Sequence, residues 1–157
     1  MAKQYQALWN FPHSMGAIDG KHVVLQCPRN SASEYFNYKN AFSIVLFNLV
    51  DANYNFMFVD AGCQGIISDS SVFTNSELCK KLETNILCLS QPIPLNGRDK
   101  SVPYFFIKDE AFPLSENVMN VYPGQQRKGT KERIFIYRIY RAQRVVTNVF
   151  GLASSVF

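Results

Sequence analysis

Residues 42–50 form a nearly continuous apolar run of strand length, Phe42-Ser43-Ile44-Val45-Leu46-Phe47-Asn48-Leu49-Val50. Such runs are typical of strands covered on both faces of a sheet, so we expect a central strand here. The residues that follow, 51–55, have turn composition. We expect Phe56-Met57-Phe58-Val59-Asp60 to return beside the first strand and complete a hairpin.

The segments around this hairpin predict the rest of one sheet and its helices. Residues 15–26 are expected to form a strand pair or a bent strand around Asp19-Gly20, and residues 102–107 another strand. Residues 30–40 and 84–102 are predicted to be loops, with Gly62 and Gly65 ending the hairpin. Helices are expected at about 70–83, after the capping sequence Ser68-Asp69-Ser70, and at about 130–152. This order predicts an α/β fold with a mixed sheet flanked by helices.

Length and composition indicate one globular domain. The chain has 157 residues, of which 47% are hydrophobic, enough for a packed core. No apolar run approaches the ~20 residues needed to span a bilayer, so we expect no membrane association. Its four cysteines show no zinc-binding spacing, and we expect free thiols in a reducing compartment.

Basic residues are concentrated at the C-terminal end. Residues 121–157 hold seven Lys and Arg residues and one Glu, whereas the first 120 residues carry a net charge of −2. A basic segment of this kind is suited to phosphate groups, although a solvated basic helix explains the charge equally well.

Three aspartates stand at the ends of apolar stretches: Asp19, Asp69 and Asp109. Each has an ordinary explanation when taken alone, as a turn residue, a helix N-cap and a loop residue respectively. Taken together they predict one metal site, because hard divalent cations such as Mg²⁺ bind carboxylate oxygens and keep several waters. Two such ions about 4 Å apart can promote cleavage of a phosphodiester bond.

Five blocks, in order from about Phe11 to the end, resemble the PIF/Harbinger transposases and the nucleases derived from them. The blocks are Gly16-Ala17-Ile18-Asp19-Gly20-Lys21-His22, Tyr35-Phe36-Asn37-Tyr38-Lys39, Gly65 through Phe73, Lys108-Asp109-Glu110-Ala111-Phe112-Pro113-Leu114, and Arg141 through Gly151.

The resemblance implies an RNase H-like fold carrying a metal-dependent DNA endonuclease site of the DDE type, with Mg²⁺ or Mn²⁺ as cofactor. Asp19 and Asp109 would be the two catalytic aspartates, and Asp69 would assist them in binding metal. His22 also matches the family, either as a residue packed near the strand end or with a role near the site. The resemblance further implies DNA as a partner, a Myb-like accessory protein, and a nuclear location, with the cytoplasm as an alternative. We expect the nucleic-acid contacts to come from basic residues, namely Lys39, Arg138, Arg141 and Arg144.

The final Glu of the family pattern falls on Thr147, 38 residues after Asp109. A hydroxyl is a neutral and weak ligand, and Glu132 lies roughly 22 Å away along an ideal helix, too far to replace the lost carboxylate. Glu110 would point away from Asp109 if the strand continued. Two hypotheses follow: a metal-dependent DNA endonuclease, or a remnant or domesticated DNA- or protein-binding domain whose chemistry is impaired. We expect a truncated copy, with residues 1–13 as an N-terminal remnant and 14–157 as the nuclease-like domain.

Overall fold

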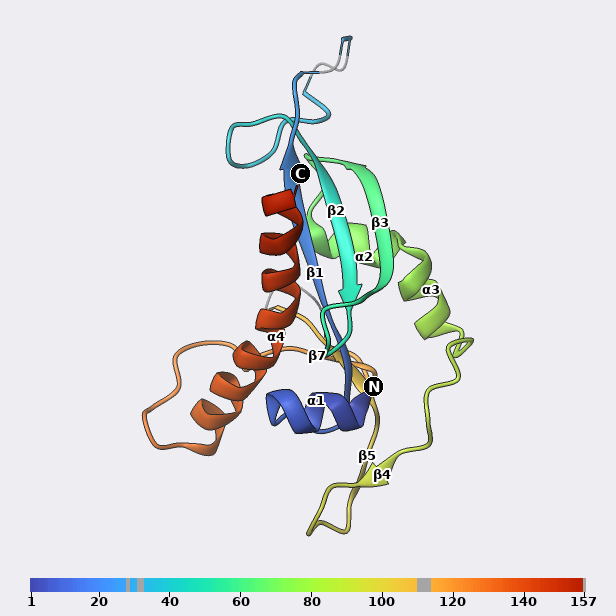
Figure 1. Cartoon of the computed structure of the whole chain (residues 1–157), viewed down its shortest axis with the longest axis vertical. Helices are drawn as coiled ribbons and strands as arrows, with labels where there is room; N and C mark the ends of the chain where they lie inside the picture. Colours follow the sequence, from blue (N-terminus) through green and yellow to red (C-terminus); the bar gives the residue numbers. More distant parts are fainter. Residues whose placement is uncertain (28, 31–32, 110–113, 157) are drawn as a thin grey trace.

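A computed structural model describes residues 1–27, 29–30, 33–109 and 114–156 of the chain. Its main sheet has the strand order β3-β2-β1-β6-β7 (Figure 1). The pairs β1–β2 and β2–β3 are antiparallel, while β1–β6 and β6–β7 are parallel. The strand bounds are β1 Ser14–Val24, β2 Ser43–Val50, β3 Phe56–Gln64, β6 Phe105–Ile107 and β7 Val118–Met119.

Helices cover both faces of this sheet (Figure 1). On one face lie α1 (Ala2–Trp9) and the long α4 (Lys131–Val156), and on the other lie α2 (Asp69–Asn75) and α3 (Glu77–Glu83). The predicted RNase H-like α/β fold, a mixed sheet flanked by helices, is therefore confirmed. Within the described ranges, no helix combines the length and apolarity that a bilayer-spanning segment requires.

The core consists of two clusters, one on each face of the sheet, because side chains alternate between the two faces along each strand. Ala17, Val50 and Ile107 pack with the buried side of α4, and their neighbours Ile18, Leu49 and Phe106 pack with α2 and α3. Successive strand residues point to opposite faces, so each strand contributes to both clusters. Each large apolar side chain that is fully buried in this way stabilises the fold by about 1.5–3 kcal/mol.

Of the two alternatives for residues 15–26, the strand pair with a turn at Asp19-Gly20 is wrong and the single strand is correct, because β1 runs through these residues without a break. Its pairing with β2 continues in register from Ala17 opposite Val50 to Val24 opposite Ser43. The predicted end of the hairpin at Gly62 is also wrong, since β3 extends to Gln64. A shift in register between β2 and β3 beside Gly62, which has φ +113°, accommodates the glycine as a bulge rather than a stop.

The helix predicted at 70–83 is two helices that meet at Ser76. Ser76 has extended backbone, with φ −71° and ψ 153°, and it ends α2 and begins α3. Its hydroxyl oxygen accepts a hydrogen bond from the Cys79 amide at 3.2 Å, which is the usual interaction of a serine N-cap. The local cap therefore overrides the apolar spacing that favoured one continuous helix.

Several elements were not predicted from the sequence. The polar segment at the N-terminus forms α1, which is anchored by the fully buried Tyr5 in the same cluster as α4. The predicted loop 84–102 contributes a short hairpin, β4 (Ile93–Pro94) with β5 (Ser101–Val102). The predicted strand 102–107 is shortened to Phe105–Ile107, and α4 extends beyond residue 152 to Val156.

Candidate metal centre

Asp19 and Asp109 follow the same pair of residues on neighbouring parallel strands. Ala17 of β1 is paired with Ile107 of β6, and each aspartate stands two positions further along. Asp19 lies within β1, so alternation directs its carboxylate to the α4 face, where Ala17 packs. Asp109 lies beyond the end of β6 and lines a cavity with residues of α4. Lys108 stands between Ile107 and Asp109 in the chain. Its side chain is fully buried on the opposite side of the sheet, over the ring of Phe73.

Asp19 sits in a partly desolvated, negatively charged environment. Its pKa is raised to about 7, chiefly by burial; the hydrogen bond from the Gly20 amide at 2.9 Å lowers it, and the charges of Asp109 and Asp69 contribute to the rise. The three predicted metal residues are thus close enough for their charges to interact. A cation placed among them would relieve the repulsion and favour their ionised forms.

Asp69 reaches this cluster from the other face of the sheet, across Gly20. A Cβ atom on Gly20 would lie 2.6 Å from Asp69 Oδ1 and 2.8 Å from its Cγ, so a residue without a side chain is required there. The N-cap of α2 is Ser68, whose hydroxyl accepts from the Ser71 amide at 3.3 Å, and the interpretation of Asp69 as the cap is therefore wrong. Asp69 Oδ1 is buried and has no hydrogen-bond partner among the described residues.

Two predicted residues are electrostatic neighbours of Asp69. Burial raises the pKa of Asp69, and the charge of Asp109 also raises it, whereas His22 and Lys39 lower it. The imidazole Nδ1 of His22 is 3.0 Å from the Ser43 hydroxyl, which fixes the ring near the end of β1. Lys39 therefore lies on the Asp69 side of the site, well separated in sequence from the basic helix.

Thr147 occupies the position expected for the missing carboxylate. Thr147 and Asp109 line one cavity of about 640 Å³ between β6 and α4. Arg141 and Arg144, two of the residues predicted to contact nucleic acid, line the same cavity. The structure thus brings together one of the two carboxylates, Asp109, with the neutral hydroxyl and two of the predicted arginines.

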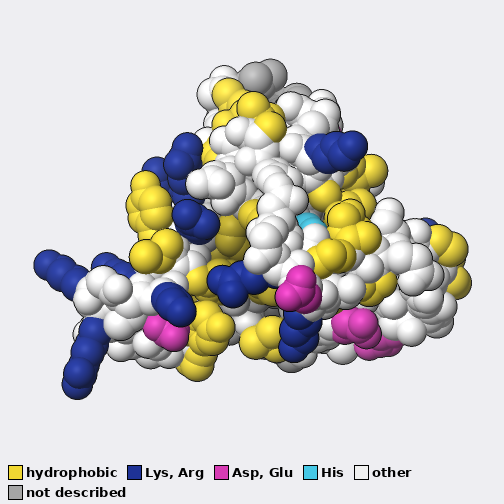
Figure 2. All heavy atoms as spheres, turned by 90° about the horizontal axis from the view of Figure 1, so that it is seen from below, with side chains coloured by type: hydrophobic (Ala, Val, Ile, Leu, Met, Phe, Trp, Pro, Cys, Tyr) yellow, Lys and Arg dark blue, Asp and Glu magenta, His cyan; other side chains and the backbone are white. Residues whose placement is uncertain are grey.

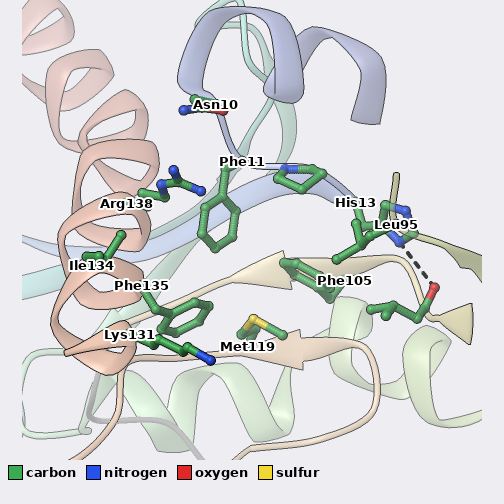
Figure 3. Close-up of a pocket in the computed structure, with 12 residues that line it drawn as sticks. Asn10, Phe11, His13, Leu95, Phe105, Met119, Lys131, Ile134, Phe135 and Arg138 are labelled. Carbon is green, nitrogen blue, oxygen red and sulfur yellow. Dashed lines mark hydrogen bonds between the residues drawn. The ribbon is translucent and has the colours of Figure 1, made fainter. Parts of the chain in front are cut away.

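Arg138 is not part of this cavity. It lines a separate, mainly apolar pocket of about 280 Å³, where its guanidinium group lies near Asn10 and Phe11 (Figure 3). Arg138 and Thr147 are nine residues apart, about two and a half helical turns, and therefore point to opposite sides of α4. This separation could have been calculated from the sequence spacing alone.

The donor set is consistent with a hard divalent cation. Carboxylate oxygens, supplemented by water, are the ligands that Mg²⁺ and Mn²⁺ prefer, and the cluster includes no thiolate. The described residues contain no group of three or more His, Cys, Asp or Glu side chains arranged to hold a metal ion. Asp19, Asp69 and Asp109, which all belong to the described residues, are therefore not arranged as a complete set of metal ligands. Glu110 lies outside the described residues.

Sequence analysis missed three residues around the site. Asn48 is directly opposite Asp19 on β2, is 0% exposed, and has no hydrogen-bond partner for either amide atom among the described residues. Its position as the single amide in an apolar run was the available signal. Tyr137 and Tyr140 line the cavity with Asp109 and Thr147.

Positive charge gathers near the beginning of α4. Figure 2 views the molecule from below, and several Lys and Arg side chains project at its left. The connection before α4 and the first turns of α4 lie on this same left side in Figure 1. Acidic side chains are few on this side of the view (Figure 2). Three of the seven basic residues of the predicted C-terminal segment, Arg133, Arg141 and Arg144, line the cavity that contains Asp109.

The mixed sheet flanked by helices, with one aspartate within β1 and another just after the parallel neighbour β6, is the arrangement expected of the DDE nuclease class. The profile of a family described as DDE superfamily endonuclease matches residues 18–157. The chain belongs to this family, which confirms the family predicted from the PIF/Harbinger-like blocks.

The chain is also similar to part of a curated plant protein. The chain is 28% identical over 124 residues to "Protein ALP1-like" from Arabidopsis thaliana. The match covers 78% of this chain and 30% of the relative, so the chain spans less than a third of that protein's length. No solved structure matches the chain.

Proposed function

We propose that this chain is a DNA-binding domain of the DDE endonuclease type that holds a divalent cation but cleaves DNA poorly. Asp19 and Asp109 would bind Mg²⁺ or Mn²⁺, and Asp69 would assist them. The observation that supports the proposal is the pairing of Ala17 with Ile107, two residues before Asp19 and Asp109 respectively. The proposed impairment is supported by the cavity that Asp109 shares with Thr147, where the family pattern has a glutamate.

The bound cation would supply Lewis acidity and lower the pKa of a coordinated water. The residues of the chain would bind the cation and position the phosphodiester. Asp19 is directed toward the α4 face, and Arg141 and Arg144 line the cavity with Asp109, where they can hold a phosphodiester. The raised pKa of Asp19 means that cation binding would also displace a proton from this cluster.

Thr147 is the reason to propose binding with impaired hydrolysis. A carboxylate at this position would add a negative charge that faces a second cation across the cavity, and the threonine hydroxyl adds none. At an effective dielectric constant of about 20, two unit charges about 4 Å apart interact by roughly 4 kcal/mol. Losing such an interaction weakens the second metal position far more than the first.

Two parts of the proposal have different support. DNA as a partner, and with it a nuclear location, is supported by the family and by the arginines that line the cavity with Asp109. A Myb-like accessory protein rests on the family resemblance alone. An alternative function, an active endonuclease, is favoured by the retained aspartates and opposed by Thr147.

Isothermal titration calorimetry with MnCl₂ tests the metal proposal. The wild type should take up Mn²⁺, and Asp19→Ala and Asp109→Ala should each weaken uptake by at least about tenfold. Asp99→Ala is a matched control because Asp99 is an exposed carboxylate in a loop that lies outside the cavity. If the wild type takes up no Mn²⁺, or Asp19→Ala binds it equally well, the proposal is wrong.

A further inference from the structure

Two exposed tyrosines line the cavity that contains Asp109 and Thr147. Tyr137 is 65% exposed and Tyr140 is 44% exposed, on the second and third turns of α4. They are three residues apart, so their rings are neighbours on one side of the helix. Neither tyrosine belongs to the hydrophobic clusters of the core.

Arginines alternate with these tyrosines along the same side of α4. The cavity lining includes Arg133 before the pair and Arg141 and Arg144 after it, and each of the last two is four residues beyond a tyrosine. Asp109 is the single acidic residue of the described lining, and it belongs to the candidate metal site. The cavity therefore combines cations that suit phosphates with two flat aromatic faces.

Interleaved cations and exposed aromatic rings are the features by which proteins hold single-stranded nucleic acid. Every unpaired base presents a π face that can stack on an aromatic ring, and the contribution is about 1–3 kcal/mol per base. Bases inside a duplex are already stacked on their neighbours and cannot use these rings. The arginines alone would favour any DNA, and the tyrosines add a preference for unpaired bases.

We propose that Tyr137 and Tyr140 stack on unpaired bases of a DNA strand whose phosphates contact Arg141 and Arg144. The preferred ligand of the cavity is then single-stranded DNA, or a frayed strand end, with its backbone next to Asp109. This proposal rests on the proposed DNA-binding function and names its substrate class.

Fluorescence anisotropy compares binding of a labelled oligo-dT strand and of a duplex of equal length, in EDTA and at fixed salt. The wild type should bind the single strand more tightly. Tyr137→Ala and Tyr140→Ala should each weaken single-strand binding by about tenfold and leave duplex binding unchanged. The double variant Tyr137→Phe/Tyr140→Phe keeps both rings and should behave as wild type.

Tyr122→Ala is a matched control, since Tyr122 is 51% exposed but does not line this cavity. Circular dichroism of each variant checks that α4 remains helical. A strand carrying 2-aminopurine gives a second measurement, because the fluorescence of this base analogue is quenched when it stacks. Quenching should occur with the wild type and the Phe variant and be reduced in both Ala variants.

The outcomes separate this proposal from the function on which it depends. If both DNAs bind and Arg141→Gln/Arg144→Gln weakens both, but the Ala variants bind oligo-dT as the wild type does, stacking is wrong and DNA binding stands. Equal wild-type affinity for the single strand and the duplex would also overturn stacking. If neither DNA binds to the wild type, both proposals are wrong.

Discussion

Ala17 of β1 is paired with Ile107 of β6, and Asp19 and Asp109 each follow two residues after this pair, Asp19 within β1 and Asp109 beyond the end of β6. Asp19 is directed to the face that α4 covers, and Asp109 lines a cavity with residues of α4. Two segments that are ninety residues apart in the chain therefore contribute to one acidic cluster. The predictions below follow from this arrangement.

Gly20→Ala should damage the fold and the site together. The added Cβ would lie 2.6 Å from Asp69 Oδ1, and the required displacement should reduce the free energy of unfolding by about 1–3 kcal/mol in urea denaturation. Adding Asp69→Ala should recover part of the loss by removing the carboxylate. Gly151→Ala is the control: a Cβ there meets nothing within 4 Å, and alanine in a helix is favoured by about 1 kcal/mol. Equal effects of the two glycine substitutions would contradict the close packing described here.

The stability of the protein should depend on pH through Asp19. Its folded pKa is about 7 against an ordinary value of 3.8, so the folded state binds the proton more tightly than the unfolded chain. This stabilising contribution is complete below about pH 4 and is lost as the pH rises through 7. Asp19→Asn has no such proton. As the pH rises between these values, the wild type should therefore lose free energy of unfolding relative to Asp19→Asn.

Chemical denaturation at several pH values, without divalent metal, measures this difference. Saturating Mn²⁺ should restore stability to the wild type above pH 7 and should not do so for Asp19→Asn. Parallel stability curves for the two proteins across the range would show that Asp19 titrates normally.

Asn48→Leu should be close to neutral or stabilising, within about 1 kcal/mol. Asn48 is fully buried and neither polar atom of its amide has a hydrogen-bond partner among the described residues, so its desolvation is not compensated there. Asn37 provides a matched control. It is also buried, but its amide donates to Ser43 Oγ at 2.8 Å and accepts from the Lys39 amide at 2.8 Å.

Asn37→Leu should therefore lose about 1–3 kcal/mol in the same denaturation experiment. If Asn48→Leu is destabilised as strongly as Asn37→Leu, Asn48 makes a stabilising contact, and the interpretation of its amide as uncompensated is wrong.

The main strands could be predicted because burial dictates their sequence. The apolar runs at 42–50 and 102–107 contain strands β2 and β6, and the long periodic segment at the C-terminus is α4. Where the predictions from the sequence were wrong, local polar interactions determined the observed structure. The Ser76 hydroxyl breaks one predicted helix into two, and a packed carboxylate explains Gly20 better than a turn. The α1 helix carries one buried residue, Tyr5, which is too weak a pattern to recognise.

The candidate site was partly predictable for a related reason. Motif spacing identified the aspartates and Thr147, but it does not reveal that Ala17 pairs with Ile107, two residues before Asp19 and Asp109 respectively. Helical spacing could have assigned Arg138 to the opposite side of α4 from Thr147. Spacing along the same helix could also have grouped Tyr137 and Tyr140 with Arg141 and Arg144.

A DNA-nicking assay on supercoiled plasmid with Mn²⁺, comparing the wild type with Thr147→Glu, tests the central claim most directly. Thr147→Gln is the control, because it has the length of glutamate without the charge. Restoring the carboxylate beside Asp109 should raise the nicking rate of Thr147→Glu at least about tenfold above the wild type, a change of about 1.4 kcal/mol in the barrier, with Thr147→Gln unchanged. Equal nicking by the wild type and Thr147→Glu would contradict the claim that Thr147 disables this site.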